Sequence, residues 1–199
     1  MAMFPLGSVL LPGGVAPLRL FEERYLEMHE RVMLAGDPFA IVLIERGFEV
    51  GGGDQRFDVG TAARVAASSE MDDGSRLVIA VGSARVRVTE WLEDDPYPRA
   101  HVDELPEPLP TDPEVVDACA AELRTTFGLL TELGVDVGEA PELPDNQVLA
   151  VYQAAQLAPL QMLDKQHVLE TDDPDARAAL VLRLLTDRNE LLRLQLEGA

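Results

Sequence analysis

The first residues of the chain alternate between short apolar runs and turn residues, which predicts a strand, a turn, a second strand and a helix. Residues 9–11 form a short apolar run typical of a buried strand, and Pro12-Gly13-Gly14 then indicates a turn. Residues 15–20 resume extended structure, where Pro17 indicates a sheet edge because proline has no N–H for a central ladder. The acidic pair Glu22-Glu23 favours a helix start, since negative charge stabilises the positive end of the helix dipole.

The pattern up to residue 104 remains that of short strands. Apolar or alternating runs predict strands at residues 39–44, 56–67, 76–81 and 85–88. In the last of these, strict alternation predicts that Arg85 and Arg87 both point outward. Gly51-Gly52-Gly53 and Asp72-Asp73-Gly74 are expected to be turns. Several short strands with one helix favour a small twisted barrel or sandwich.

A proline-rich segment at residues 105–111 predicts an extended connector, and the hydrophobic period then changes from two to 3.6. We therefore expect a β-rich subdomain at residues 1–110 and a helical subdomain at residues 111–199. A bundle of three or four helices is the expected form of the second subdomain.

Capping residues predict where these helices begin. Thr111 or Asp112 precedes Pro113, Pro144-Asp145-Asn146 opens a second helix, and Asp173-Pro174 opens a long last one; a short helix at about residues 160–169 follows Pro159. The apolar spacing predicts which side chains face inward. These are Val115, Cys119, Leu123, Phe127 and Leu130 in the first helix, Val148, Leu149, Tyr152 and Ala155 in the second, and Leu180, Leu184, Leu191 and Leu194 in the last.

Composition narrows the classes of partner. The formal net charge of −20 should repel phosphate backbones and anionic lipid, so we expect neither nucleic-acid nor membrane binding. The acidic surface serves solubility or docks one basic protein. A single cysteine, Cys119, excludes an intramolecular disulfide and favours a reducing, cytoplasmic location. No apolar run approaches the ~20 residues that a membrane helix needs.

Groups that could perform chemistry are sparse. The sole lysine, Lys165, is followed by Gln166, so no phosphate-binding G-x-x-x-x-G-K-[ST] loop is present. The three histidines, His29, His101 and His167, have no metal-binding spacing, and Cys119 is interpreted as a buried apolar residue. We therefore expect no catalytic residue, no metal site and no cofactor.

Several segments together resemble the N-terminal domain of Lon-type ATP-dependent proteases. They are Phe4-Pro5-Leu6, Leu11-Pro12-Gly13, Pro17-Leu18, Phe21-Glu22-Glu23-Arg24-Tyr25, and the strands at residues 58–65 and 82–91. Departures are small: Leu11, Leu20 and Glu23 stand where Phe, Ile and Pro are common. The resemblance implies an α+β fold, in which an N-terminal PUA-like β pseudo-barrel with one or two helices precedes a C-terminal α-helical bundle.

The resemblance also implies a function in bacterial protein quality control. Full-length members carry ATPase and Ser-Lys protease modules after this domain, and neither is expected in these 199 residues. The chain would then be a non-catalytic polypeptide-binding module, an adaptor or regulator, whose partners are unfolded or degron-bearing polypeptides and a Lon-type protease. Two alternatives stay open: an enzyme with a site in a cleft between the subdomains, using His101 or His167, and an interaction domain for one basic protein.

The candidate site is the strand-to-helix corner formed by Phe21, Glu22, Arg24 and Tyr25. In a structural interpretation, Phe21 and Tyr25 anchor the corner, and Glu22 and Arg24 form a cap or an ion pair. In a functional interpretation, the corner rims a groove between barrel and bundle that binds extended peptide.

Overall fold

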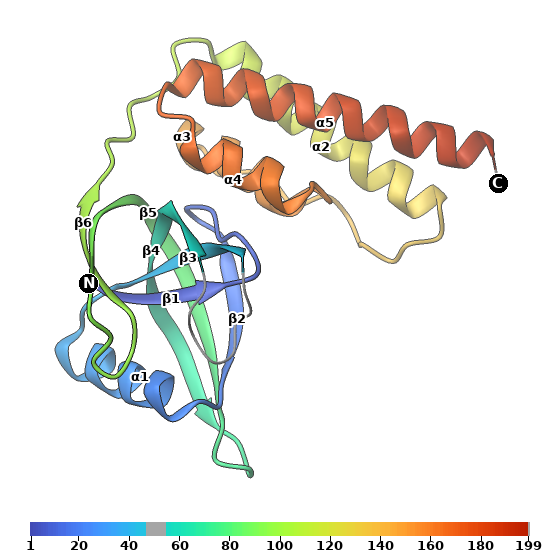
Figure 1. Ribbon diagram of the computed structural model, residues 1–199. Helices are drawn as coiled ribbons and strands as arrows, with labels where there is room; N and C mark the ends of the chain where they lie inside the picture. The colour runs from blue at the N-terminus through green and yellow to red at the C-terminus, as the bar shows by residue number, and fades with distance from the viewer. Residues whose placement is uncertain (47–54, 199) are drawn as a thin grey trace. The chain divides into compact units, whose positions relative to one another are not determined.

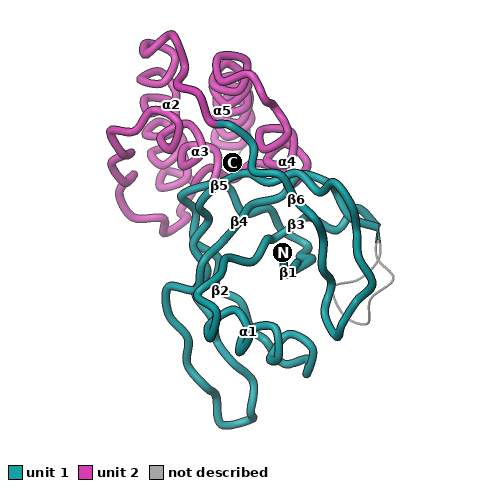
Figure 2. Tube along the Cα trace, turned by 90° about the vertical axis from the view of Figure 1, so that its left-hand side faces the viewer, with its two compact units in different colours: residues 1–106 teal, residues 107–199 magenta. Residues whose placement is uncertain are grey.

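The computed structural model describes residues 1–46 and 55–198, which form two compact units, Met1–Pro106 and Glu107–Ala199 (Figures 1 and 2). The turn predicted at Gly51-Gly52-Gly53 lies outside the described residues. The fold is mixed α+β, as expected. The division into a β-rich subdomain at residues 1–110 and a helical subdomain at residues 111–199 stays a prediction.

Unit 1 is a small barrel with one helix among its described residues. Its elements are β1 (Ala2–Leu6), β2 (Val15–Leu20), α1 (Glu23–Ala35), β3 (Phe39–Arg46), β4 (Gln55–Glu70), β5 (Arg76–Leu92) and β6 (Arg99–Glu104). The strand order is β2-β5-β4-β3-β1-β6, and a further pairing of β5 with β6 closes the last five strands into a ring. β2 remains outside the ring, paired with the first half of β5. The expected pseudo-barrel is confirmed, and so is the edge position of Pro17.

Strand β5 differs from its prediction in being continuous. The sequence predicts separate strands at residues 76–81 and 85–88, but a single strand passes through Gly82. Gly82 marks a close approach instead of a break, because a Cβ at this position would lie 2.7 Å from the carbonyl oxygen of Leu11. The outward orientation predicted for Arg85 is wrong: its side chain is buried, and Nη2 donates to the carbonyl oxygen of Pro106 at 3.3 Å.

The first strand also lies elsewhere than predicted. Residues 9–11 form a buried loop, and the strand is β1, which pairs in parallel with β3. The loop can be buried because its polar backbone finds partners. Thr61 donates its hydroxyl hydrogen to the carbonyl oxygen of Leu10. The turn at Pro12-Gly13-Gly14 is confirmed, with Gly13 at a φ of 77°.

Helix α1 covers an apolar core on one side of the sheet (Figure 1). Tyr25, Met28 and Val32 point inward from the helix. They belong to the same buried cluster as Phe4, Leu18, Leu20, Phe39 and Val78. The helix ends where Gly36 adopts a φ of 70°, a conformation that glycine favours.

Unit 2 contains four helices in the part of the chain that the structure describes: α2 (Pro113–Glu132), α3 (Gln147–Leu157), α4 (Met162–Glu170) and α5 (Pro174–Glu197). The capping predictions are confirmed. The side chains of Asp112, Asn146 and Asp173 accept hydrogen bonds from the backbone N–H groups of Glu114, Leu149 and Ala176. No described helix is both long and apolar enough to cross a bilayer.

The inward faces of the helices were predicted less well. In α5, Leu180 is buried as predicted and Leu184 is half-buried, whereas Leu191 and Leu194 are exposed. The other buried residues of this helix include Ala178, Val181, Leu185, Asn189 and Leu192. In α2 the buried residues are Val116, Cys119, Leu123 and Thr126, whereas Val115, Phe127 and Leu130 are only half-buried. In α3, Leu149 is half-buried.

A buried polar contact explains this shift of the α5 face. The Nδ2 group of Asn189 donates to the carbonyl oxygen of Glu122 at 3.0 Å and to its carboxylate at 2.7 Å, and the hydroxyl of Thr126 lies 2.7 Å from the side-chain oxygen of Asn189. A buried amide with these partners incurs no penalty for an unmade hydrogen bond. An asparagine can therefore occupy a core position of the helix.

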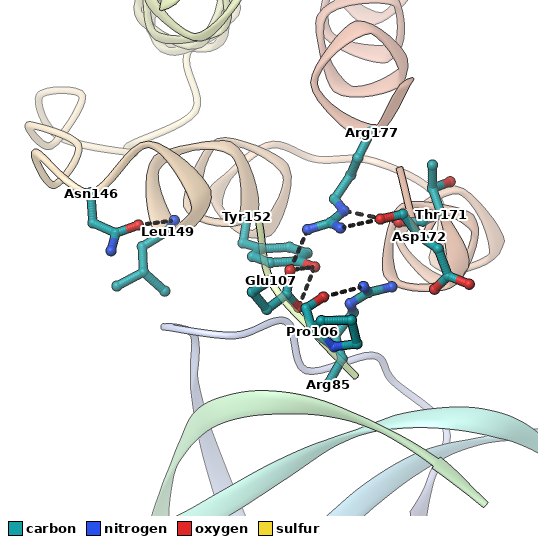
Figure 3. A network of polar contacts seen from close by, with 9 residues as sticks. All are labelled: Arg85, Pro106, Glu107, Asn146, Leu149, Tyr152, Thr171, Asp172 and Arg177. Carbon is teal, nitrogen blue, oxygen red and sulfur yellow. Dashed lines mark hydrogen bonds and ion pairs between the residues drawn. The ribbon is translucent and has the colours of Figure 1, made fainter. Parts of the chain in front are cut away.

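The start of unit 2 is held by a second polar network (Figure 3). The Glu107 carboxylate accepts hydrogen bonds from Nη1 of Arg177 at 2.6 Å and from the Tyr152 hydroxyl at 2.9 Å. Arg177 also donates to the carbonyl oxygens of Thr171 and Asp172. These bonds attach the irregular segment at residues 107–110 to helices α3 and α5.

Candidate functional site

A hollow of about 320 Å³ opens in unit 1 where β1, β2 and the start of α1 meet. It is lined mainly by apolar and aromatic side chains. The lining residues are Phe4, Pro5 and Leu6 of β1, Pro17, Leu18 and Arg19 of β2, and Phe21, Glu22 and Tyr25 of the corner. Three of the four residues predicted as a site therefore line one hollow, and Arg24 contacts two of them.

Phe21 is the exposed aromatic of this hollow. It lies between the end of β2 and the start of α1, and 58% of its surface is accessible to solvent. The prediction that Phe21 anchors the corner is therefore wrong. A large apolar side chain in this setting is available for contact with another molecule.

Tyr25 has the opposite role, because it is only 4% exposed. Its ring lies 4.6 Å from that of Phe4 in a tilted arrangement, and Phe4 in turn meets the edge of Phe39 at 6.5 Å. Such aromatic pairs add to the stabilisation from buried area. Tyr25 is therefore an anchor, as the structural interpretation expected, and it is one of the residues that line the hollow.

Glu22 and Arg24 form the ion pair that the sequence suggested. Nη2 of Arg24 lies 3.0 Å from the Glu22 carboxylate, and the guanidinium lies 4.6 Å above the Tyr25 ring. Glu22 is the N-cap residue of α1, yet its side chain makes no capping hydrogen bond. The ion pair and the cation–π contact fix Arg24 beside the hollow and neutralise the Glu22 charge.

A second ion pair lies at the β2 side of the hollow. Arg19 pairs with Asp73, and Asp73 also accepts hydrogen bonds from the hydroxyl of Ser75 at 2.6 Å and its N–H at 3.0 Å. The bonds from Ser75, followed by the contact with Arg19, lower the pKa of Asp73 to about 2. The Asp73 side chain is thus charged at neutral pH and balances Arg19.

Sequence reasoning missed the contribution of β1 and most of β2 to this hollow. Phe4 and Leu6 give no local signal, because their role depends on which strand segments lie near them. Pro5 gives a weak one, since a proline donates no hydrogen bond to a strand ladder. A proline in each of the two strand segments, at Pro5 and Pro17, could have indicated the hollow.

The histidines considered for catalysis lie in different surroundings. His101 lines a separate hollow of about 490 Å³ with Arg31, whose guanidinium lies 5.6 Å above the Tyr97 ring. His167 is exposed on α4. His29 is buried on α1, and burial lowers its pKa; neither ring nitrogen has a hydrogen-bond partner among the described residues.

The remaining reactive groups, Cys119 and Lys165, are buried and half-buried, respectively. Cys119 is inaccessible, as expected, and burial raises the pKa of its thiol to about 12. Burial also lowers the pKa of Lys165, whose Nζ donates to the carbonyl oxygen of Gln156 at 2.8 Å. Within residues 1–46 and 55–198, no three His, Cys, Asp or Glu side chains gather closely enough to hold a metal ion.

These features define a mixed α+β protein with an apolar hollow on its barrel unit. The model of the ATP-dependent protease La (LON) substrate-binding domain matches residues 1–187, and the chain belongs to this family. The family that the sequence segments resemble is thereby confirmed.

Two curated relatives are named Lon proteases. The chain is 29% identical over 195 residues to Lon protease 2 of Myxococcus xanthus, a match that covers 94% of this chain and 23% of that protein. It is 31% identical over 198 residues to Lon protease 2 of Thermus thermophilus, covering 95% of this chain and 24% of that protein. The chain therefore spans about a quarter of the length of these relatives.

Solved structures show the same fold. A Lon N-terminal domain protein from Xanthomonas campestris superimposes with a TM-score of 0.65 at 24% identity, covering 92% of this chain and 96% of that one. The N-terminal domain of a Lon protease from the Mycobacterium avium complex gives a TM-score of 0.66 at 19% identity, covering 95% and 97%.

Proposed function

We propose that the chain is a non-catalytic polypeptide-binding module that holds extended apolar segments in the hollow of unit 1. The observation that supports this most directly is the exposed Phe21 ring beside a hollow lined by apolar side chains. Burial of such a ring against a client stabilises the complex by about 1–2 kcal/mol, because part of the ring is already covered. Several such apolar contacts, without a charged or covalent anchor, suit transient capture.

The charges around the hollow fit a promiscuous site. Arg24 is paired with Glu22, and Arg19 is paired with Asp73. A client therefore does not need a particular charge in a particular place, and apolar contact decides whether it binds. Unfolded polypeptides expose such apolar segments, whereas folded proteins bury them.

The family match supports the same function. The matched model describes a substrate-binding domain, and the relatives are named Lon proteases. On this basis we propose an adaptor or regulator in cytoplasmic protein quality control, with unfolded or degron-bearing polypeptides and a Lon-type protease as partners.

Fluorescence anisotropy tests the proposal. A labelled, permanently unfolded polypeptide and its natively folded counterpart would each be titrated with the protein at low and high salt. We expect binding of the unfolded chain alone, and that binding should persist at high salt because apolar contacts are not screened. Phe21→Ala should weaken it, whereas Leu34→Ala, which removes an apolar side chain that is 91% exposed on helix α1, should not.

Two results would contradict this function. Equal binding of the folded and unfolded chains would mean that exposed apolar segments are not recognised. Binding confined to one basic folded protein, and abolished by salt, would favour the alternative of an acidic docking domain.

A further inference from the structure

The hollow borders the backbone of strand β2. Three consecutive residues of β2, Pro17, Leu18 and Arg19, line it, and so do three consecutive residues of β1. Successive side chains of a strand point to opposite faces of the sheet. A hollow that touches three residues in a row therefore reaches backbone atoms as well as the side chains of one face.

The direction of the β2 backbone groups follows from its pairing. Within the described residues β2 pairs only with β5, and the N–H of Gly82 donates to the carbonyl oxygen of Gly14 at 3.0 Å. Backbone groups of an antiparallel strand alternate between its two sides. This hydrogen bond shows that the backbone groups of Gly14 point toward β5. Because Val15 lies opposite Val81 and the sides alternate along the strand, the backbone groups of residues 16, 18 and 20 also point toward β5.

The alternate residues, Val15, Pro17 and Arg19, consequently turn their backbone groups away from β5. We call this row the β2 edge. It offers carbonyl oxygens at all three positions but N–H groups only at Val15 and Arg19, since proline has none. The position of Pro17 agrees with the assignment of this row to the open side of β2, because a proline whose backbone faced β5 would have removed a hydrogen bond between β2 and β5.

We propose that a client segment binds by strand addition to the β2 edge, with its apolar side chains in the hollow and against Phe21. This inference rests on the proposed function and specifies how the same site holds its client. An extended polypeptide presents alternating N–H and C=O groups, which are the groups that complement an open strand edge. The fit of backbone to backbone is independent of client sequence, as a module that captures many clients requires.

The charges near the hollow and over the whole chain also affect which client segments bind. The two arginines nearest the hollow are paired with carboxylates, and the whole chain has a net charge of −20. Acidic segments are therefore disfavoured, and apolar contacts decide among the remaining segments. The missing donor at Pro17 leaves one hydrogen bond fewer in the ladder, which keeps capture reversible.

The test compares two variants of one residue. Arg19→Pro removes the N–H at the β2 edge together with the side chain, whereas Arg19→Ala removes only the side chain and its ion pair with Asp73. The probe is a labelled, uncharged Thr-Val repeat peptide, titrated by anisotropy after circular dichroism has shown both variants to be folded. We expect Arg19→Pro to bind roughly tenfold more weakly than Arg19→Ala, the effect of one lost hydrogen bond.

Two further measurements keep the test decisive if Arg19→Pro fails to fold. Pro17→Ala supplies the missing N–H and should bind the peptide several-fold more tightly than the unmodified protein. Hydrogen exchange on the complex with the unfolded polypeptide should show slower exchange of the Val15 and Arg19 amides than in the protein alone.

The possible failures are distinguishable. If the polypeptide binds and Phe21→Ala weakens it, but the amides of the β2 edge are not protected and Pro17→Ala has no effect, strand addition is wrong and the proposed function stands. If neither the peptide nor the unfolded polypeptide binds, the proposed function itself is wrong. Concentration-dependent dimers that protect the same amides without peptide would assign the β2 edge to a second copy of the chain and overturn the inference.

Discussion

Nη1 of Arg177 donates a hydrogen bond of 2.6 Å to the Glu107 carboxylate, which joins the first residue of unit 2 to the first turn of its last helix. Arg177 is only 2% exposed, and its guanidinium also lies 4.8 Å above the Tyr152 ring. The pair thus connects two segments that are 70 positions apart in sequence.

We expect Glu107→Ala to destabilise unit 2 by about 3 kcal/mol, because it leaves the buried Arg177 charge without its carboxylate. Urea unfolding followed by helical circular dichroism measures the loss. Glu190→Ala removes an exposed carboxylate of α5 and should change the free energy of unfolding by less than about 0.5 kcal/mol. Equal losses in the two variants would show that the buried pair has no special role.

Tyr25 and Phe21 should respond in opposite ways to truncation. Tyr25→Ala should cost roughly 3 kcal/mol or more of stability, since the ring is buried against Phe4. Phe21→Ala should leave stability nearly unchanged and weaken polypeptide binding, because the ring is exposed. Urea unfolding and anisotropy on both variants separate the two effects; a binding loss in Phe21→Ala that merely follows a loss of stability would refute the assignment.

The buried His29 should make stability depend on pH. Burial, and to a lesser extent the charge of Arg76, lower its pKa below the unfolded value of 6.5. Between the two values the unfolded chain binds a proton that the native imidazole does not. The free energy of unfolding should therefore decrease as the pH falls below about 6.5.

Urea unfolding at a series of pH values tests this expectation. His29→Leu should remove part of the slope between about pH 5 and 7, because an apolar side chain has no proton to bind. His167→Gln, at an exposed position of α4, should retain the slope. The assignment to His29 fails if both variants match the unmodified protein.

Cys119 should be inert in the native state. Its thiol is buried with a pKa of about 12, so very little thiolate exists at neutral pH. An aromatic disulfide reagent at mildly alkaline pH should react at least ~100-fold more slowly with the native protein than with the urea-unfolded chain. Rapid reaction of the native thiol would show that the α2–α5 contact opens readily.

Local signals in the sequence predicted the helix starts and turns well. A cap depends on a few neighbouring residues, so Asp112, Asn146 and Asp173 could be recognised without knowledge of the fold. The turn at Pro12-Gly13-Gly14 has the same local origin. The pseudo-barrel came from the family resemblance, and the ring of pairings confirms it.

The buried face of α5 could not be predicted in this way. Leucines lie on several sides of this helix, so an apolar stripe can be drawn at more than one angle. The true stripe includes Asn189, which can be buried only because groups of α2 complete its hydrogen bonds. A contact between residues 67 positions apart leaves no local signal.

The roles of the two aromatic residues in the candidate corner also could not be predicted from the local sequence. Phe21 and Tyr25 are four positions apart, which suggests a shared helix face. Helix α1 begins only at Glu23, however, so Phe21 precedes it and its ring points elsewhere. Which of the two aromatics is buried depends on where Phe4 lies, and that is set by the pairing of β1 with β3.

The bond from Lys165 to Gln156 has a practical consequence for covalent chemistry. Lys165 is the single lysine among 16 basic side chains, and its amine is partly buried. Reagents and enzymes that acylate side-chain amines, or that attach a protein tag through an isopeptide bond, thus have one poorly accessible target in these 199 residues. A surface that presents arginine in place of lysine keeps its positive charges while offering almost no acceptor for such a tag.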